Sequence, residues 1–403
     1  MSLPKVKLVI LVGGPSKGTR FRPLSMDTPK PLFPVSDKPL VWHHVSASCA
    51  SLNGKADLRE ILLIGFYDGK NPEWSKFISN VEAEFKVPVR YLQEEGRTGT
   101  GGGIIRFRNE IQSGSPDYFY VEHCDVVCSF PLADLLQSHQ SSGKDITILG
   151  KRVPSDQAHR YGCIVVHPES HEVIHYAEKP ETFISDIINC GVYLFSTTSF
   201  FDLVEKVRQN SKREPGSDPN SFQLEQDLFM PVSHNKAINC FLSQEFWIQL
   251  KSAGMVIKCH EHFMRVNAEK LKLAKSGFQV QGNVMVDPTA KIDPSAKLGP
   301  NVSIGAGVVI GPGVRISNSI VLDNSEIKER SCILYSVVGW KCTIGKWARL
   351  EGVPDFSAQG DDKSNGITIL GNGVTVANET VIRASIVLPH KELSGSYADQ
   401  ILL

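Results

Sequence analysis

The chain has 403 residues, with 43 Lys and Arg against 43 Asp and Glu, and nine cysteines. This length favours two domains, and the balanced charge argues against a protein that binds nucleic acid or an anionic membrane. No apolar run reaches the roughly 20 residues of a membrane span. No cysteine spacing matches a zinc site, so we expect a cytoplasmic protein with free thiols.

The first part of the chain alternates strand-like and helix-like segments. Runs rich in Val, Ile, Leu and aromatic residues predict strands at residues 8–12, 60–64, 89–92, 118–122 and 146–150. Between them, apolar residues at helical spacing predict helices at residues 41–49, 73–85 and 104–111. This alternation is typical of a doubly wound, mixed α/β sheet of the Rossmann-like type, and we assign residues 1–265 to this domain.

A glycine-rich segment follows the first predicted strand. Gly13 and Gly14 end the apolar run, and Arg20 and Lys30 come soon after them. Glycine lets the backbone turn tightly and approach an anion, so that amide N–H groups can cradle a phosphate, while Arg and Lys add positive charge. Ligands bind beyond the carboxyl ends of such strands, so Asp125, which follows the strand at residues 118–122, should lie near this segment.

A different pattern begins near residue 280. One column of aliphatic residues recurs every six positions, and a second column lies two residues before it. The first column comprises Val286, Ile292, Leu298, Ile304, Ile310, Ile316 and Leu322. A hexapeptide repeat is typical of a parallel β-helix, whose stacked coils enclose an apolar core. We therefore assign residues 266–403 to a β-helix domain, interrupted by a polar insertion at residues 352–366.

These motifs together resemble those of a known family. The stretch GGPSKGTRFRPLS, followed by PKP, resembles the signature of sugar-1-phosphate nucleotidyltransferases, and its union with a hexapeptide β-helix is similar to the GDP-mannose pyrophosphorylases (mannose-1-phosphate guanylyltransferases). The stretches EILLIGFY, FISDIINCGVYLFS and SIVLPHKELS look closest to the eukaryotic alpha-type subunits. The resemblance implies a nucleotidyltransferase fold and a left-handed coil. It also implies attack of a sugar-1-phosphate on the α-phosphorus of a nucleoside triphosphate, assisted by Mg²⁺.

The resemblance also implies roles for individual residues. It places Gly13, Gly14, Thr19, Arg20 and Lys30 around the nucleotide phosphates, Gln93, Glu94, Gly99 and Thr100 at the base, and Gly162, Glu178, Lys179 and Asn189 at the sugar and its phosphate. Arg20, Lys30 and Lys179 would be the catalytic residues of an active enzyme, and Asp125 would bind the metal near the ribose. From the residues alone, several of the sugar-side positions could also be ordinary strand, turn or capping residues.

Departures from the family pattern bear on activity. Active members carry a second metal-binding Asp shortly after a Trp, whereas this chain has Gln249 after Trp247. An amide is a weaker Mg²⁺ ligand than a carboxylate, because a unit charge at about 4 Å contributes roughly 4 kcal/mol at an effective dielectric constant of about 20. Residues 15–17 also lengthen the glycine segment, which is enough to displace Arg20 by several ångströms. His123 is an unexpected neighbour of the metal position.

These features favour a regulatory subunit that binds GDP-mannose, is catalytically weak or inactive, and modulates a catalytic beta-type homologue. In the alternative, the chain is an active mannose-1-phosphate guanylyltransferase in which Asp125 alone, with water, holds Mg²⁺. A third interpretation is acyl transfer, because hexapeptide β-helices occur in acetyltransferases with a histidine base, and His390 lies in this repeat. We expect the β-helix to mediate assembly into a homodimer or a larger hetero-oligomer.

Overall fold

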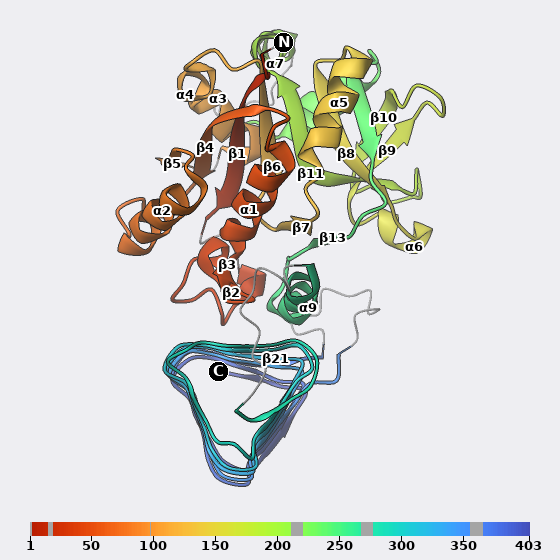
Figure 1. Ribbon diagram of the computed structural model, residues 1–403. Coiled ribbons are helices and arrows are strands. Elements are labelled where there is room, and N and C mark those ends of the chain that lie inside the picture. Colours follow the sequence, from red (N-terminus) through yellow and green to blue (C-terminus); the bar gives the residue numbers. More distant parts are fainter. Residues whose placement is uncertain (1, 15–18, 97, 211–220, 267–276, 355–365) are drawn as a thin grey trace. The chain divides into compact units, whose positions relative to one another are not determined.

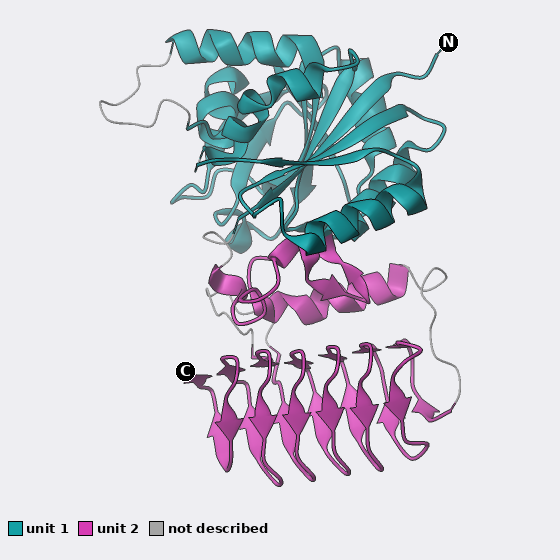
Figure 2. Cartoon of the chain, turned by 90° about the vertical axis from the view of Figure 1, so that its left-hand side faces the viewer, with its two compact units in different colours: residues 1–14, 41–249 teal, residues 15–40, 250–403 magenta. Residues whose placement is uncertain are grey.

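The computed structural model describes residues 2–14, 19–96, 98–210, 221–266, 277–354 and 366–403. The chain forms two compact units (Figure 2). Unit 1 comprises Met1–Gly14 and Val41–Gln249, and unit 2 comprises Pro15–Leu40 and Leu250–Leu403. Unit 2 thus contains the β-helix together with two segments that precede the predicted boundary at residues 265/266, and that boundary stays a prediction.

Unit 1 is built on a nine-stranded mixed sheet (Figure 1). The strand order is β10-β9-β11-β6-β1-β4-β5, with β8 paired to β11 and β12 paired to β8. The strands are β1 (Lys5–Gly13), β4 (Asp57–Gly65), β5 (Val89–Gln93), β6 (Tyr118–His123), β8 (Ile146–Arg152), β9 (Gly162–Val166), β10 (Val173–Glu178), β11 (Ile187–Ser196) and β12 (Ile238–Leu242). Strands β5, β4, β1 and β6 run parallel, whereas β11 runs antiparallel to β6. Each strand predicted from the sequence lies within one of these strands, which confirms the mixed α/β sheet.

Helices cover both faces of this sheet. They are α1 (Leu40–Leu52), α2 (Pro72–Phe85), α3 (Gly99–Arg106), α4 (Arg108–Gln112), α5 (Leu132–Ser142), α6 (Ser155–Ala158), α7 (Thr197–Asn210), the π-helix η3 (Leu224–Phe229) and α8 (Met230–Ser233). On β6, Phe119 packs against Phe200 of α7, whereas the hydroxyl of Tyr120 donates a hydrogen bond to the Leu132 carbonyl at the start of α5. Successive side chains of a strand point to opposite faces, so α5 and α7 lie on different sides of the sheet. The single helix predicted at residues 104–111 is divided between α3 and α4.

Two short strands of unit 1 form a separate sheet outside the main one. They are β7 (Val126–Cys128) and β13 (Trp247–Gln249), and they pair antiparallel with Gln249 opposite Val126. Among the described residues, none of the helices combines the length and the apolar character that a bilayer-spanning segment requires.

Unit 2 contains short elements from two parts of the sequence and the β-helix. The short elements are η1 (Thr19–Phe21), η2 (Lys30–Leu32), β2 (Pro34–Val35), β3 (Lys38–Pro39), η4 (Ala253–Met255) and α9 (Val256–Val266). The β-helix consists of three parallel sheets of short strands, which confirms the predicted coil architecture. Its handedness stays a prediction.

The three sheets of the β-helix run along its length. The first contains β14 (Gln279–Val280), β17 (Lys297–Leu298), β20 (Arg315–Ser317), β23 (Cys332–Leu334), β26 (Arg349–Glu351), β29 (Val381–Arg383) and β32 (Ser396–Ala398). The second contains β15 (Val284–Val286), β18 (Val302–Ile304), β21 (Ser319–Val321), β24 (Ser336–Val338), β27 (Thr368–Leu370), β30 (Ile386–Val387) and β33 (Ile401–Leu402). The third contains β16 (Lys291–Ile292), β19 (Val309–Ile310), β22 (Glu326–Ile327), β25 (Thr343–Ile344), β28 (Thr375–Val376) and β31 (Glu392–Leu393).

The repeat changes its length within the coil. Val284 pairs with Val302, but Val302 pairs with Ser319, so the second interval is one residue shorter than the first. The predicted column therefore shifts after Ile316, and Val321, not Leu322, stands beside Ile304. The shortening is accompanied by left-handed backbone at Asn318 (φ 45°), between β20 and β21.

Candidate functional site

The carboxyl ends of the parallel strands of unit 1 gather several predicted site residues at one edge of the sheet. Gly13 ends β1 opposite Gly65 of β4, and Gly65 lies opposite Gln93 at the end of β5. On the other side of β1, His123 ends β6 opposite Leu11. This is the edge at which doubly wound sheets bind their ligands.

Gly13 occupies this edge for a conformational reason. Its φ of +72° lies in the left-handed region, which favours glycine. Among the described residues, no atom lies within 4 Å of the position that a Cβ would take, so the backbone conformation and not a lack of space favours glycine here. Gly14 follows it and is buried, with Phe66 against the position of a Cβ at 2.7 Å. Residues 15–17, predicted to displace Arg20, lie outside the described residues.

The residues predicted at the base lie at the end of β5, directly after it, and in the first turn of α3. Gln93 is exposed, and its side-chain oxygen accepts a hydrogen bond from the Gly69 amide at 3.1 Å. Glu94 is buried and accepts a hydrogen bond from the Thr98 hydroxyl. Gly99 has a φ of +82° and lies so close to the carbonyl of Phe222 that a Cβ would be 2.5 Å from its oxygen.

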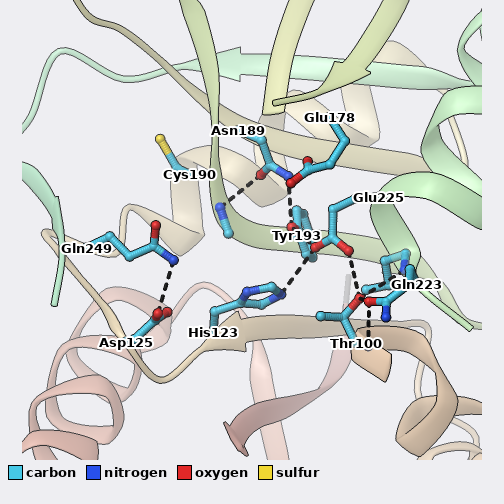
Figure 3. Close-up of polar contacts among 12 residues, drawn as sticks. Thr100, His123, Asp125, Glu178, Asn189, Cys190, Tyr193, Gln223, Glu225 and Gln249 are labelled. Carbon is cyan, nitrogen blue, oxygen red and sulfur yellow. Dashed lines mark hydrogen bonds and ion pairs between the residues drawn. The ribbon is translucent and has the colours of Figure 1, made fainter. Parts of the chain in front are cut away.

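Thr100, in the first turn of α3, contacts a distant part of the chain. Its hydroxyl donates to Glu225 Oε2 at 2.7 Å (Figure 3). It accepts from the Leu224 amide at 3.0 Å. Both partners belong to the π-helix η3, a rare helix type that is frequent at functional sites. This contact fixes η3 next to the segment predicted to hold the base.

The residues predicted at the sugar form one hydrogen-bonded group. The Asn189 side-chain nitrogen donates to the hydroxyl oxygens of Tyr176 at 3.0 Å and Tyr193 at 2.9 Å. The Tyr176 hydroxyl donates to Glu178 at 3.0 Å. The Tyr193 hydroxyl donates to Glu225 at 3.2 Å (Figure 3). Burial raises the pKa of both Tyr176 and Tyr193 well above the usual value, so both hydroxyls keep their protons and remain donors.

Gly162 lies within this group at a position where a side chain would collide with its neighbours. It pairs with Glu178 across β9 and β10, and an added Cβ would be 2.1 Å from the Tyr176 hydroxyl oxygen and 2.8 Å from Glu178 Oε2. Lys179 comes directly after β10, is exposed, and has its ammonium 3.1 Å from Glu178 Oε1. The structure thus brings together all four residues predicted for the sugar side, and their roles toward a ligand stay predictions.

Asp125 and Gln249 face each other. Gln249 ends β13, and its side-chain nitrogen donates a hydrogen bond to Asp125 Oδ2 at 3.0 Å (Figure 3). The nitrogen end of the amide must face the carboxylate, because its oxygen would be repelled there. One oxygen of Asp125 is therefore already paired with a donor from the position at which active family members carry an acid.

This pair is a poor match for a bound dication. Mg²⁺ is held by oxygen ligands, usually with one or two carboxylates, but here the amide presents its N–H to the site. Within the described ranges, no group of three or more His, Cys, Asp or Glu side chains could hold a metal ion. The residues present do not form the two-carboxylate site expected of an active enzyme.

Three predicted phosphate-site residues belong to unit 2. Thr19 and Arg20 form η1 and are exposed. Lys30 begins η2, donates its ammonium to the Leu250 carbonyl and lies 5.5 Å from the centre of the Phe21 ring. Their predicted roles at the phosphates stay predictions.

Sequence reasoning missed the residues that connect the two halves of the site. Tyr193 lies in the family-like stretch FISDIINCGVYLFS without a predicted role, and Glu225 lies outside the family-like stretches. Glu225 joins Thr100 to Tyr193, and its Oε1 lies 3.7 Å from His123 Nε2. The one signal in the sequence is that two acidic residues, Glu225 and Asp227, lie between Leu224 and Leu228. That signal does not say which distant residues they contact.

Comparison with known proteins gives the family. Residues 7–228 match the nucleotidyl transferase family, and residues 280–402 match the GMPPB C-terminal domain. The chain is 44% identical to the mannose-1-phosphate guanylyltransferase regulatory subunit alpha of Dictyostelium discoideum, and the match covers 100% of both chains. It is 46% identical to the protein of the same name from Homo sapiens, across 99% of this chain and 100% of that protein. The chain belongs to the family of mannose-1-phosphate guanylyltransferase regulatory subunits alpha.

A solved structure supports the fold of this family member. It is a Bacillus anthracis protein, named as a candidate glucose-1-phosphate thymidylyltransferase and crystallised with a sucrose. The similarity has a TM-score of 0.50 at 18% identity and covers 67% of this chain and 97% of that one. At this identity the similarity shows the nucleotidyltransferase fold alone.

Proposed function

We propose that this chain binds GDP-mannose at the carboxyl edge of the unit 1 sheet, has little or no guanylyltransferase activity of its own, and modulates a catalytic homologue. The observation that carries the proposal is the contact between the Gln249 amide and the Asp125 carboxylate. It leaves the sugar-side hydrogen-bonded group complete while replacing a metal-binding acid with a neutral donor. The family relatives are named regulatory subunits, which supports a catalytic partner for this chain.

Regulation of this kind requires that occupancy of the site favour one state of the subunit over another. The subunit would act in the cytoplasm, assembled through its β-helix. In the absence of a second carboxylate we expect Mg²⁺ to bind weakly, so GDP-mannose should bind about equally well with and without it.

Two measurements on the purified chain test this proposal. Calorimetry should detect GDP-mannose binding, and the dissociation constant should change less than about threefold when Mg²⁺ is added. A pyrophosphate-release assay with GTP, mannose-1-phosphate and Mg²⁺ should give no appreciable turnover. Rapid pyrophosphate release would instead support the alternative of an active guanylyltransferase with Asp125 as its sole acidic ligand.

Variants at two positions locate the site. Asn189→Ala removes the donor shared by Tyr176 and Tyr193, and it should weaken GDP-mannose binding at least tenfold, whereas Asn53→Ala at an exposed position should not. Gln249→Asp restores an acid beside Asp125 and should make binding depend on Mg²⁺. Gln249→Ala is its control, because it removes the amide without adding charge.

A further inference from the structure

A fully buried carboxylate lies in the centre of the unit 1 sheet. Glu122 on β6 stands between Ile10 of β1 and Val192 of β11, and it is 0% exposed. A buried charge is strongly unfavourable unless it is paired and hydrogen-bonded. A conflict of this kind within an otherwise apolar strand is expected at sites that serve function, so its partners are informative.

Both partners of Glu122 come from one face of α1. His44 Nδ1 lies 2.8 Å from Glu122 Oε2, and the Ser48 hydroxyl donates to Glu122 Oε1 at 2.8 Å. These positions are one turn apart on the helix and therefore share a face. The His44 side chain is 1% exposed, and its ring lies 4.6 Å from the ring of Phe130, so the pair is enclosed.

The second ring nitrogen of His44 contacts the main chain. Nε2 lies 3.2 Å from the carbonyl oxygen of Cys124, an atom that can only accept a hydrogen bond, so Nε2 carries a proton and donates it. Nδ1 lies 2.8 Å from Glu122 Oε2, and this second hydrogen bond fixes the orientation of the ring.

The Cys124 peptide connects His44 and Glu122 to the candidate site. Cys124 lies between β6 and β7, directly before Asp125. Its amide donates to the Leu11 carbonyl at 3.1 Å, next to the glycine turn, and its carbonyl accepts from His44. Both the amide and the carbonyl of Cys124 are thus hydrogen-bonded. Asp125 is the next residue, and its carboxylate accepts a hydrogen bond from the Gln249 amide.

We propose that His44 is a positioning residue for the candidate site: held in orientation by Glu122, it fixes the Cys124 carbonyl and thereby sets the position of the Asp125 carboxylate toward the nucleotide sugar. The ligand part of this inference rests on the proposed function. The part that concerns the peptide before Asp125 does not, and it can be measured without ligand.

Two amide substitutions separate the two hydrogen bonds of His44. In His44→Asn, the side-chain nitrogen takes the place of Nδ1, so the contact with Glu122 is kept and the contact with the Cys124 carbonyl is lost. In His44→Gln, the nitrogen takes the place of Nε2, and Glu122→Gln is combined with it so that no unpaired carboxylate is left. His390→Asn makes the same chemical change at an exposed histidine and is the control.

Calorimetry should show about tenfold weaker GDP-mannose binding for His44→Asn and binding within about threefold of the parent for the double variant. In the ligand-free chain, the Asp125 amide resonance should move in His44→Asn and stay near its parent position in the double variant. Parent-like binding and an unmoved resonance in His44→Asn, or equal losses in both variants, would overturn the proposal.

The unsubstituted chain gives a second test, which holds even if His44→Asn does not fold. With ¹⁵N-labelled histidine, Nε2 of His44 should show the shift of a protonated ring nitrogen. An unprotonated Nε2 would overturn the proposal. A parent chain that gives the protonated Nε2 signal but binds no GDP-mannose would contradict the proposed function while leaving the positioning role supported.

Discussion

The sheet of unit 1 and the β-helix of unit 2 solve the burial of polar groups in different ways. Over the described residues from 277 onward, every buried polar side chain is a Ser or Thr. Ser325 and Ser331, for example, donate to main-chain carbonyls of a neighbouring coil at 2.8 Å each. In the sheet unit, by contrast, Lys7, Glu94 and Glu122 are buried.

The two units therefore differ in where they bury charged side chains. In the coil, neutral hydroxyls form hydrogen bonds with the backbone, and the same kind of bond can recur in successive coils. A buried carboxylate requires a specific partner from a distant segment, and a half-satisfied arrangement is worse than an apolar one. Two of the buried acids of unit 1, Glu94 and Glu122, lie at or near the carboxyl ends of β5 and β6, where the candidate ligand edge is.

The largest expected effect comes from placing a charge in the coil interior. Ile310 is 2% exposed and its neighbour Val309 is 42% exposed on the same strand. Ile310→Asp should lower the free energy of unfolding by about 5 kcal/mol, because no basic side chain is buried in the described part of the coil to pair with an interior acid. Val309→Asp, the matched control, should lower it by less than about 1 kcal/mol. Chemical unfolding followed by circular dichroism measures both, and equal effects would contradict an apolar interior column.

Acid should destabilise the sheet unit through a buried histidine. Burial lowers the pKa of His139 to about 4 from the model-compound value of 6.5, despite the opposing charge of Asp145. Because the folded value is the lower one, the stability contributed by the neutral ring is complete above pH 6.5 and is lost as the pH falls toward 4, by roughly 3 kcal/mol.

His139→Gln should therefore flatten the dependence of the unfolding free energy on pH between 6.5 and 4. It should not abolish that dependence, since burial also lowers the pKa of His260 and His262 in unit 2 to about 4. His390→Gln, at an exposed position, is the control. An unchanged slope in His139→Gln would show that this ring does not titrate with unfolding.

An intermediate effect is expected at Gly162. In Gly162→Ala the new methyl group would collide with the Tyr176 hydroxyl and Glu178, so these side chains must move. We expect a loss of about 2 kcal/mol in stability and at least tenfold weaker GDP-mannose binding by calorimetry. Gly96→Ala is the control, because a Cβ there meets no atom within 4 Å. Normal GDP-mannose binding by Gly162→Ala would separate this group from the ligand site.

The smallest effect is expected on the surface of the coil. Arg330 lies 5.1 Å from the ring centre of Trp347, which is 58% exposed. A cation–π contact at such an exposed site contributes about 0.5–1 kcal/mol, so Arg330→Ala should shift the unfolding midpoint only slightly. Arg330→Lys keeps the charge and should shift it less. A loss for Arg330→Ala as large as that of Gly162→Ala would show that this surface carries more of the coil's stability than its exposure indicates.

The sequence predicted most of the fold because periodicity and strand composition are local properties. The alternation of segments in unit 1 and the columns through Ile304, Ile310 and Ile316 needed no knowledge of distant contacts. The column failed at Leu322 because one residue is missing from the coil, and a six-residue period cannot show where the chain shortens.

The site was predictable only in part, for a physical reason. Motif residues such as Asn189 could be assigned from resemblance, but their partners depend on how strands pair. Glu225 and Thr100 are 125 residues apart, and His44 and Glu122 are 78 apart. Hydrogen bonds between residues so far apart produce no recognisable spacing in the sequence, so the buried contact between His44 and Glu122 could not be predicted.

The insertion after β26 shows how the β-helix accommodates additional residues between two of its strands. Ser336 of β24 pairs directly with Thr368 of β27, so the ladder continues across the interruption, and the Val353 amide closes its neck by donating to the Gly366 carbonyl at 2.7 Å. For a loop whose ends are already joined in this way, doubling the number of residues adds only about 0.6 kcal/mol of closure entropy. Related chains can therefore gain or lose residues at this insertion with little loss of stability in the coils on either side.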